Sequence, residues 1–331
     1  MSRAVVYIAL QQFGEHDTRP MELLVQADFE VRRNQLGRRL RREDMVEVLR
    51  DADAVLAGVE PYDGTVLAAL PKLRCISRCG VGTDSIDLEA ATRCGITVYT
   101  TIEEVVEPVA QMTLAMILAL ARNIPLHLAD TRGGHWKKHP GVLLSEWTIG
   151  LVGFGRIGRA VARYLGAFGP RLLVTDPKLD GTGVEESVEF CDLPTLLANA
   201  DLVTVHANRS PKEGVLLGQT ELRVMKPGSF LVNTSRGFLV DEAALYDALM
   251  SGHLAGAALD VFENEPYAGA LTQLPHVCCT PHVATLTRAS RSAMEYRCVK
   301  NVMDYFEKRD ATIRMAAEPS PHHWFKERET I

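Results

Sequence analysis

The sequence predicts an α/β protein with two open parallel sheets. Short apolar runs alternate with helical patterns through the first hundred residues, and a second alternating series follows Thr101. An apolar helical pattern then returns from Ser290 to Phe306. Strands separated by helices form parallel sheets, because each parallel connection needs a crossover. We therefore expect one discontinuous domain, residues 1–101 and 285–331, and one inserted domain, residues 102–284.

The first series contains four predicted strands and two predicted helices. The strands are AVVYIAL, ADAVLAG, LRCISRC and GITVYT, and the helices are MVEVLR and DLEAATRC. Apolar runs of this length, bounded by turn residues, are typical of buried strands. They predict the sheet of the discontinuous domain.

A longer helix is predicted to start near Pro108 and to run through QMTLAMILALAR to about Arg122. Proline suits the first helical turn because its missing N–H has no partner there. The helix is apolar on nearly every side, which indicates burial in the fold or at a subunit interface.

The inserted series begins with the strand TIGLVG, the helix GRAVARYLGAFG and the strand RLLVTD. Further strands are predicted at LVTVHA, FLVNTS, AGAALDV and HVCCTPH. These elements predict a second parallel sheet. The polar tail AAEPSPHHWFKERETI is expected either to be disordered or to lie over a partner.

Composition excludes several classes of protein. The 331 residues are 47% hydrophobic and 24% charged, which is ordinary for globular domains, and the net charge of -6 argues against a nucleic-acid surface. The longest apolar stretch, Met112 to Ala121, is shorter than the roughly 20 residues of a membrane span, and no secretory signal is evident. Seven cysteines without CxxC pairs predict free thiols, no metal site and a cytoplasmic location.

The segment GFGRIG predicts a dinucleotide site. Gly153 permits a tight turn after a strand, Gly155 admits a pyrophosphate to the backbone, and Gly158 lets the next helix pack closely. Arg156 and Ile157 lie within the same turn. A helix N-terminus then faces the anion, whereas the glycines alone would also fit an unrelated tight turn.

Asp176 ends the next strand, where a carboxylate accepts hydrogen bonds from ribose hydroxyls and repels a 2'-phosphate. We therefore expect NAD rather than NADP as the cofactor. We also assign His206 and Thr234 to the cofactor site, and Asp260 to the nicotinamide carboxamide.

Three later segments, NTSRG, DVFENEP and TPHVA, supply the groups that reduction of a 2-keto acid needs. Arg236 is suited to bind the substrate carboxylate and polarise the carbonyl, and His282 to donate a proton. Glu265 would accept the other ring proton of His282 and favour the imidazolium. Each residue alone has an ordinary structural explanation, so the prediction rests on their joint occurrence at strand ends.

These motifs resemble the D-isomer-specific 2-hydroxyacid dehydrogenase family, close to its phosphoglycerate dehydrogenase branch. The resemblance covers roughly residues 50 to 306 and rests on RCGVGTDSIDLEAATRCGI, GLVGFGRIGRAVA, NTSRGFLVDEAAL, GAALDVFENEP and TPH. It implies two Rossmann-like or flavodoxin-like parallel-sheet domains with an interdomain cleft, catalysis by Arg236, Glu265 and His282, and a homodimer. It also implies that backbone amides around Val81 and Gly82 help to hold the substrate carboxylate.

Substrate identity is left open by the sequence. Arg78 matches an arginine that phosphoglycerate-type relatives use near the distal phosphate, which favours a second anionic group on the substrate. Glu103 and Glu104 would disfavour such a substrate if they faced it, but solvated hinge residues are the simpler interpretation. Gln111 and Asn208 depart from the family pattern, the first near the hinge and the second near the adenine pocket.

A different class of function remains open at this stage. The same scaffold serves corepressors that bind NAD and recruit peptides with little catalysis. The complete set of arginine, glutamate and histidine favours an enzyme, because a binding protein does not require it. Consumption of NADH with 2-keto acids would separate the two hypotheses.

Overall fold

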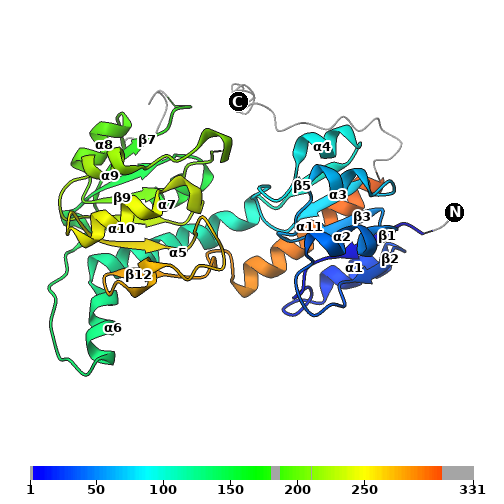
Figure 1. The fold of residues 1–331 in the computed structure, drawn as a ribbon, viewed down its shortest axis with the longest axis horizontal. Helices are drawn as coiled ribbons and strands as arrows, with labels where there is room; N and C mark the ends of the chain where they lie inside the picture. Colours follow the sequence, from blue (N-terminus) through cyan, green and yellow to red (C-terminus); the bar gives the residue numbers. More distant parts are fainter. Residues whose placement is uncertain (1–2, 180–186, 210, 308–331) are drawn as a thin grey trace. The chain divides into compact units, whose positions relative to one another are not determined.

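The structure is a computed structural model and describes residues 3–179, 187–209 and 211–307. The chain divides into two compact units (Figure 1). Among these residues, unit 1 comprises 3–105 and 287–307, and unit 2 comprises 106–179, 187–209 and 211–286. The sequence placed these boundaries at residues 101/102 and 284/285. The predicted C-terminal tail lies outside the described residues.

Unit 1 is a five-stranded parallel sheet with the order β2-β1-β3-β4-β5. Its elements are β1 (Val5–Ile8), α1 (Arg19–Gln26), β2 (Glu30–Arg33), α2 (Arg42–Leu49), β3 (Ala54–Ala57), α3 (Gly64–Ala68), β4 (Cys75–Arg78), α4 (Leu88–Arg93), β5 (Thr97–Thr100) and α11 (Arg288–Glu307). The returning helix α11 packs against β3, β4 and β5 and along α1. It therefore completes the core of a sheet whose first strand begins at Val5, near the other end of the chain.

Unit 2 is a seven-stranded parallel sheet with the order β12-β11-β10-β9-β6-β7-β8. Its helices are most of α5 (Glu103–Ala121), α6 (Ile124–Arg132), α7 (Arg156–Gly166), α8 (Leu193–Asn199), α9 (Gln219–Val224) and α10 (Glu242–Met250). Its strands are β6 (Thr148–Val152), β7 (Arg171–Thr175), β8 (Glu189–Phe190), β9 (Leu202–Val205), β10 (Ser229–Asn233), β11 (Leu254–Leu259) and β12 (Val277–Cys279). The strand order reverses between β6 and β9, the switch point at which such sheets bind ligands.

Four helices in the described residues begin at an aspartate whose side chain accepts backbone N–H groups. These are Asp63 before α3, Asp87 before α4, Asp192 before α8 and Asp241 before α10. Such caps satisfy N–H groups that the first helical turn leaves without partners. They fix where the helices start, and hence where the preceding loops end. The predicted α/β class with two parallel sheets is confirmed.

The predicted start of the long helix was wrong. Helix α5 begins at Glu103, so Pro108 lies inside it and not in its first turn. Proline has no N–H to donate to the carbonyl four residues earlier, which is that of Glu104. The hydroxyl of Ser290 on α11 donates to this carbonyl instead, at 3.0 Å. A tertiary hydrogen bond therefore makes the internal proline tolerable.

Helix α5 is also the one helix in the described residues that is long and apolar enough to cross a membrane by length and composition. Buried helices of globular proteins satisfy the same criterion. Ala110, Met116, Ile117 and Leu120 of α5 belong to the core cluster that also contains β6 and α7 side chains. Packing within the fold accounts for the apolar composition of α5.

Candidate active site

The glycine-rich turn joins β6 to α7 at the switch point of the unit 2 sheet. Gly153 has a φ of +98°, and a Cβ there would lie 2.6 Å from the His206 carbonyl carbon. A Cβ on Gly158 would lie 2.4 Å from the Gly153 carbonyl oxygen. Both glycines are therefore required by the fold of the turn itself.

Gly155 differs from its two neighbours. Its φ is -73°, and a Cβ would meet no protein atom within 4 Å. The fold alone thus gives no reason for glycine at this position. A ligand that approaches the backbone would explain the glycine. A side chain at this position would fill the space in front of the α7 N-terminus, where a pyrophosphate binds. The residues of the turn fit a dinucleotide.

Asp176 follows β7 and lies beside this turn. Its Oδ2 accepts the Phe154 amide at 2.8 Å, and its Oδ1 accepts the Lys178 amide at 2.9 Å. These bonds hold a carboxylate next to the glycine turn, and the ribose role of Asp176 stays a prediction. Arg156 and Ile157 open α7, and both remain partly or fully accessible.

The three predicted catalytic residues follow three neighbouring strands. Arg236 comes after β10, Glu265 after β11 and His282 after β12, and these strands are paired in this order. The carboxyl ends of parallel strands lie at one edge of the sheet. The backbone brings the segments closer still, because a Cβ on Gly237 would lie 1.9 Å from the carbonyl carbon of Phe262. The loop leading to Glu265 thus packs directly on the residue after Arg236.

Glu265 and His282 are hydrogen-bonded. The His282 Nδ1 atom lies 2.8 Å from Glu265 Oε2, and Glu265 Oε1 accepts the Phe262 amide at 3.1 Å. The His282 side chain is 48% exposed and the Glu265 side chain 36% exposed, so the pair faces outward from the sheet edge. With Nδ1 donating to the carboxylate, the Nε2 atom of His282 is directed away from the pair and is available for proton exchange.

Asp260, at the end of β11, fixes the turn that carries His282. It is fully buried, and its two oxygens accept the Thr280 hydroxyl at 2.5 Å and the amides of Val283 and Ala284 at 2.9 and 2.8 Å. These donors flank His282, whose φ of +54° is unusual for a residue with a side chain. The sequence assigned Asp260 to the nicotinamide carboxamide, which stays a prediction, and gave no signal for this second role.

Thr234, assigned to the cofactor, is held by a residue that the sequence did not identify. The Thr234 hydroxyl lies 2.8 Å from that of Thr113, which donates to Val109 O on α5. Both threonines are buried. Helical periodicity places Thr113 on the buried face of α5, but no pattern shows which strand end it reaches.

His206 follows β9, and its Nε2 lies 3.0 Å from the Thr204 hydroxyl. Desolvation by burial lowers the pKa of His206 to about 3. The imidazole is therefore neutral at physiological pH, and its cofactor role stays a prediction.

In unit 1, the predicted substrate loop follows β4. Arg78 donates from Nε to Gly82 O at 3.1 Å and from Nη1 to Cys79 O. Val81 is 37% exposed at the tip of the loop. The Gly80 amide donates to the Thr101 hydroxyl at 2.8 Å. The loop is thus an ordered turn with Val81 and Gly82 accessible, and its substrate role stays a prediction.

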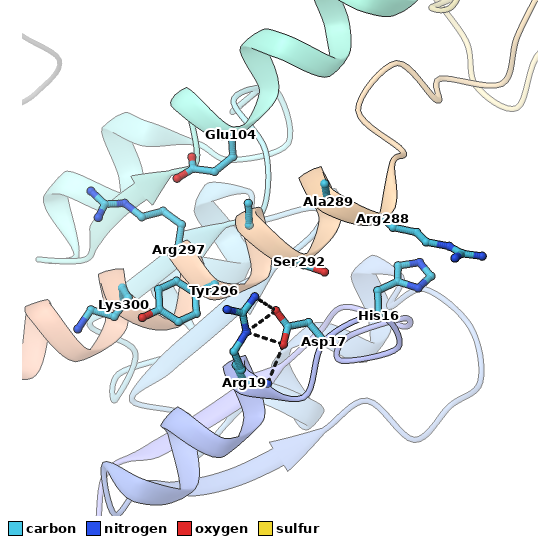
Figure 2. Close-up of a pocket in the computed structure, with 11 residues that line it drawn as sticks. His16, Asp17, Arg19, Glu104, Arg288, Ala289, Ser292, Tyr296, Arg297 and Lys300 are labelled. Carbon is cyan, nitrogen blue, oxygen red and sulfur yellow. Dashed lines mark hydrogen bonds and ion pairs between the residues drawn. The ribbon is translucent and has the colours of Figure 1, made fainter.

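Unit 1 also contains a hollow of about 890 Å³ between the loop after β1 and α11 (Figure 2). None of the predicted site residues lines it. Asp17 and Arg19 form a bidentate pair at its wall, and this pair lowers the pKa of Asp17. The cationic and anionic side chains of the wall give no sign of a particular ligand.

In residues 3–179, 187–209 and 211–307, no group of three His, Cys, Asp or Glu side chains is arranged to hold a metal ion. Burial raises the pKa of Cys279 to about 11 and that of Cys278 above its usual value, so these thiols stay protonated.

The chain is similar to known proteins of one family. Residues 114–284 match the model of the D-isomer specific 2-hydroxyacid dehydrogenase NAD binding domain. A glyoxylate reductase from Thermococcus litoralis is 37% identical over 273 residues, which are 79% of this chain and 82% of the relative. A D-3-phosphoglycerate dehydrogenase from Mycobacterium tuberculosis is 38% identical over 251 residues, or 74% of this chain and 48% of the relative. The chain thus spans about half the length of that dehydrogenase.

Solved structures show the same architecture. A glyoxylate reductase from Paecilomyes thermophila has a TM-score of 0.84 and 27% identity, with 93% of this chain and 97% of that chain covered. A D-lactate dehydrogenase from Aquifex aeolicus, in complex with NAD and lactic acid, has a TM-score of 0.81 and 27% identity, with 92% and 95% covered. These relatives are reductases and dehydrogenases, which does not favour the corepressor hypothesis. The chain belongs to the D-isomer specific 2-hydroxyacid dehydrogenase family of NAD-dependent oxidoreductases.

Proposed function

We propose that Arg236, Glu265 and His282 together interconvert a small 2-keto acid and the corresponding D-2-hydroxy acid in this NAD-dependent dehydrogenase. The observation that supports this most strongly is the 2.8 Å hydrogen bond between His282 Nδ1 and Glu265 Oε2, at the sheet edge where Arg236 also emerges. A histidine backed by a carboxylate, with an arginine at the end of the strand next to that of the carboxylate, suits acid–base chemistry on a carboxylate substrate.

In the direction of reduction, the Arg236 guanidinium binds the substrate carboxylate through its planar set of N–H donors. His282, protonated on both ring nitrogens, donates its Nε2 proton to the carbonyl oxygen. Glu265 accepts the hydrogen bond from Nδ1–H and stabilises the imidazolium. In oxidation the neutral Nε2 accepts the hydroxyl proton. NAD, when bound, supplies the hydride donor or acceptor.

The cofactor would be held by the residues at the glycine turn and at the neighbouring strand ends of unit 2. Gly155 and the α7 N-terminus bind the pyrophosphate, and Asp176 binds the ribose hydroxyls. His206, Thr234 and Asp260 complete the cofactor set. A carboxylate at the ribose position favours NAD, because it repels the 2'-phosphate of NADP.

The test is turnover of NADH with glyoxylate, pyruvate, hydroxypyruvate, phosphohydroxypyruvate and a bulky aromatic 2-keto acid. We expect reduction of at least one small acid, slower reduction with NADPH, and oxidation of D- rather than L-2-hydroxy acids with NAD. Intact NADH binding without turnover of any acid would contradict the proposal.

We also propose that the protein is a cytoplasmic homodimer. Helix α6 buries none of its residues within the chain, and Ile124 and Leu128 on one face are 43% and 45% exposed. Trp136 in the following segment is 87% exposed. Helices in folded proteins gain most of their stability from a buried face, so a second copy of the chain is the natural cover for this one.

A further inference from the structure

A buried carboxylate stands in the loop that follows β3. Glu60 is only 3% exposed, and its Oε2 atom accepts the Gly58 amide at 2.7 Å. Within the described residues this is the one hydrogen bond of the Glu60 side chain. A carboxylate has about four acceptor positions and is costly to bury without partners. Glu60 therefore has unused acceptor capacity.

The loop that contains Glu60 lies beside the predicted substrate loop. Strands β3 and β4 are paired along their whole length, and the Cys79 amide donates to Ala57 O at 2.9 Å. A Cβ on Gly58 would lie 3.3 Å from a methyl carbon of Leu10, in the loop after β1. The loops after β1, β3 and β4 thus meet at the carboxyl edge of the sheet, where open parallel sheets bind ligands.

A second buried polar group occupies the same loop. Tyr62 is wholly buried, and its hydroxyl has no hydrogen-bond partner in the described part of the chain. Burial raises the pKa of Tyr62 well above its usual value. The negative charge of Glu60 raises this pKa further, and the positive charge of Arg78 lowers it. The Tyr62 hydroxyl is therefore a neutral donor. The loop thus holds two buried polar groups, Glu60 and Tyr62, whose hydrogen-bonding capacity the described residues do not fully use.

The contacts of Arg78 bear on the nature of a ligand at this edge of the sheet. Two of its guanidinium nitrogens donate to carbonyls of its own loop, those of Gly82 and Cys79. A Cβ on Gly80 would lie 2.5 Å from Nη1, so the guanidinium rests on this turn. Arginine binds phosphate through the same N–H groups. These contacts disfavour a distal phosphate, and the Glu60 carboxylate would repel one.

We propose that Glu60 is a specificity-determining residue that accepts a hydrogen bond from a hydroxyl on the far end of the substrate and excludes a phosphate there. This inference rests on the proposed reduction of 2-keto acids. A hydroxyl donates a hydrogen bond, so it matches the unused acceptor capacity of Glu60, whereas an ionised phosphate chiefly accepts. The substrate class is a 2-keto acid with a hydroxyl on C3, and hydroxypyruvate is the probe.

The experiment compares kcat/KM with NADH for glyoxylate, hydroxypyruvate and phosphohydroxypyruvate in the wild type, Glu60→Gln and the control Glu47→Gln. Glu47 is exposed on α2, so its substitution changes the net charge equally. We expect the wild type to favour hydroxypyruvate over the phosphorylated acid by about tenfold or more. Glu60→Gln should reduce that ratio by about tenfold, with glyoxylate changed by less than about twofold. Glu47→Gln should match the wild type.

The outcomes separate the hypotheses. A wild type that favours phosphohydroxypyruvate overturns the proposal, and so does a Glu60→Gln variant that slows all three acids equally, as a merely structural role predicts. If Glu60→Gln does not fold, Glu60→Asp takes its place, because it retains the charge. This variant must still discriminate against the phosphorylated acid as the wild type does. Reduction of glyoxylate with an unchanged ratio in Glu60→Gln rejects this inference alone. No reduction of any acid rejects the proposed function as well.

Discussion

The hydrogen bond between Glu265 and His282 predicts the effect of a single substitution. Reduction requires a proton on His282 Nε2, and a carboxylate 2.8 Å from Nδ1 orients the ring and stabilises its charged form. In Glu265→Gln the amide is neutral, so kcat/KM for reduction should fall by about tenfold or more. Glu263→Gln, two residues earlier and also exposed, is the matched control and should match the wild type. Near-normal kcat/KM in Glu265→Gln would show that the hydrogen bond has no role in proton transfer.

Burial of His206 is expected to make the stability of the folded protein depend on pH. Burial lowers its pKa to about 3 from the ordinary 6.5. Between these values the unfolded chain binds more protons than the folded chain, so stability falls as pH decreases from about 6.5. This residue contributes at most about 1.4 kcal/mol per pH unit to that slope.

Urea unfolding at several acidic pH values measures the slope. The variant His206→Gln should have a shallower acid dependence than the wild type, whereas His135→Gln, an exposed histidine, should not. Equal slopes in all three proteins would mean that His206 titrates normally in the folded state.

At the scale of elements, two glycines of the same turn are expected to have different roles, one in cofactor binding and one in folding. Gly155→Ala adds a methyl group where no protein atom lies within 4 Å, so the fold should keep its melting temperature while NAD affinity falls by about tenfold or more. Gly153→Ala places a Cβ at φ +98° and 2.6 Å from the His206 backbone, so it should lower Tm sharply. Calorimetry and NADH titration measure both. Equal loss of Tm in the two variants would remove the argument for a ligand at Gly155.

Most strands were predictable because they are short apolar runs before a turn. The strand β2 was missed, since its sequence EVRR is charged and mostly exposed at the edge of the sheet. Helix α5 was predicted to begin too late, because the Ser290 hydroxyl that compensates for Pro108 comes from a segment far along the chain. The local sequence pattern thus identified the helix, but a tertiary hydrogen bond determines where it begins.

The candidate site was predictable to the extent that its residues follow strand ends in recognisable motifs. Arg236, Glu265 and His282 were identified as candidates in this way, and their catalytic roles stay predictions. Thr113, which holds Thr234, was not, because nothing in a helix sequence shows its partner. Glu60 was missed for a related reason. Its burial follows from how three loops meet, and the sequence alone suggests an ordinary solvated carboxylate.

At the scale of the whole molecule, the unpacked face of α6 predicts the assembly. Leu128→Asp should convert the proposed dimer to monomers, because a charge would be buried in an apolar contact. Val25→Asp on α1, where the side chain is 65% exposed, is the control and should leave the mass unchanged. Light scattering after gel filtration measures the mass. A wild type that is already monomeric would contradict this part of the account.

We propose that groups from neighbouring strand ends act on one substrate as a unit. A double-mutant cycle of kcat/KM for glyoxylate, with Arg236→Gln, His282→Asn and both together, tests it most directly. We expect each single variant to lose about a hundredfold or more, and the double variant to lose far less than the product of the two, because both groups stabilise the same transition state. Losses that multiply independently, or near-normal turnover in His282→Asn, would contradict the account.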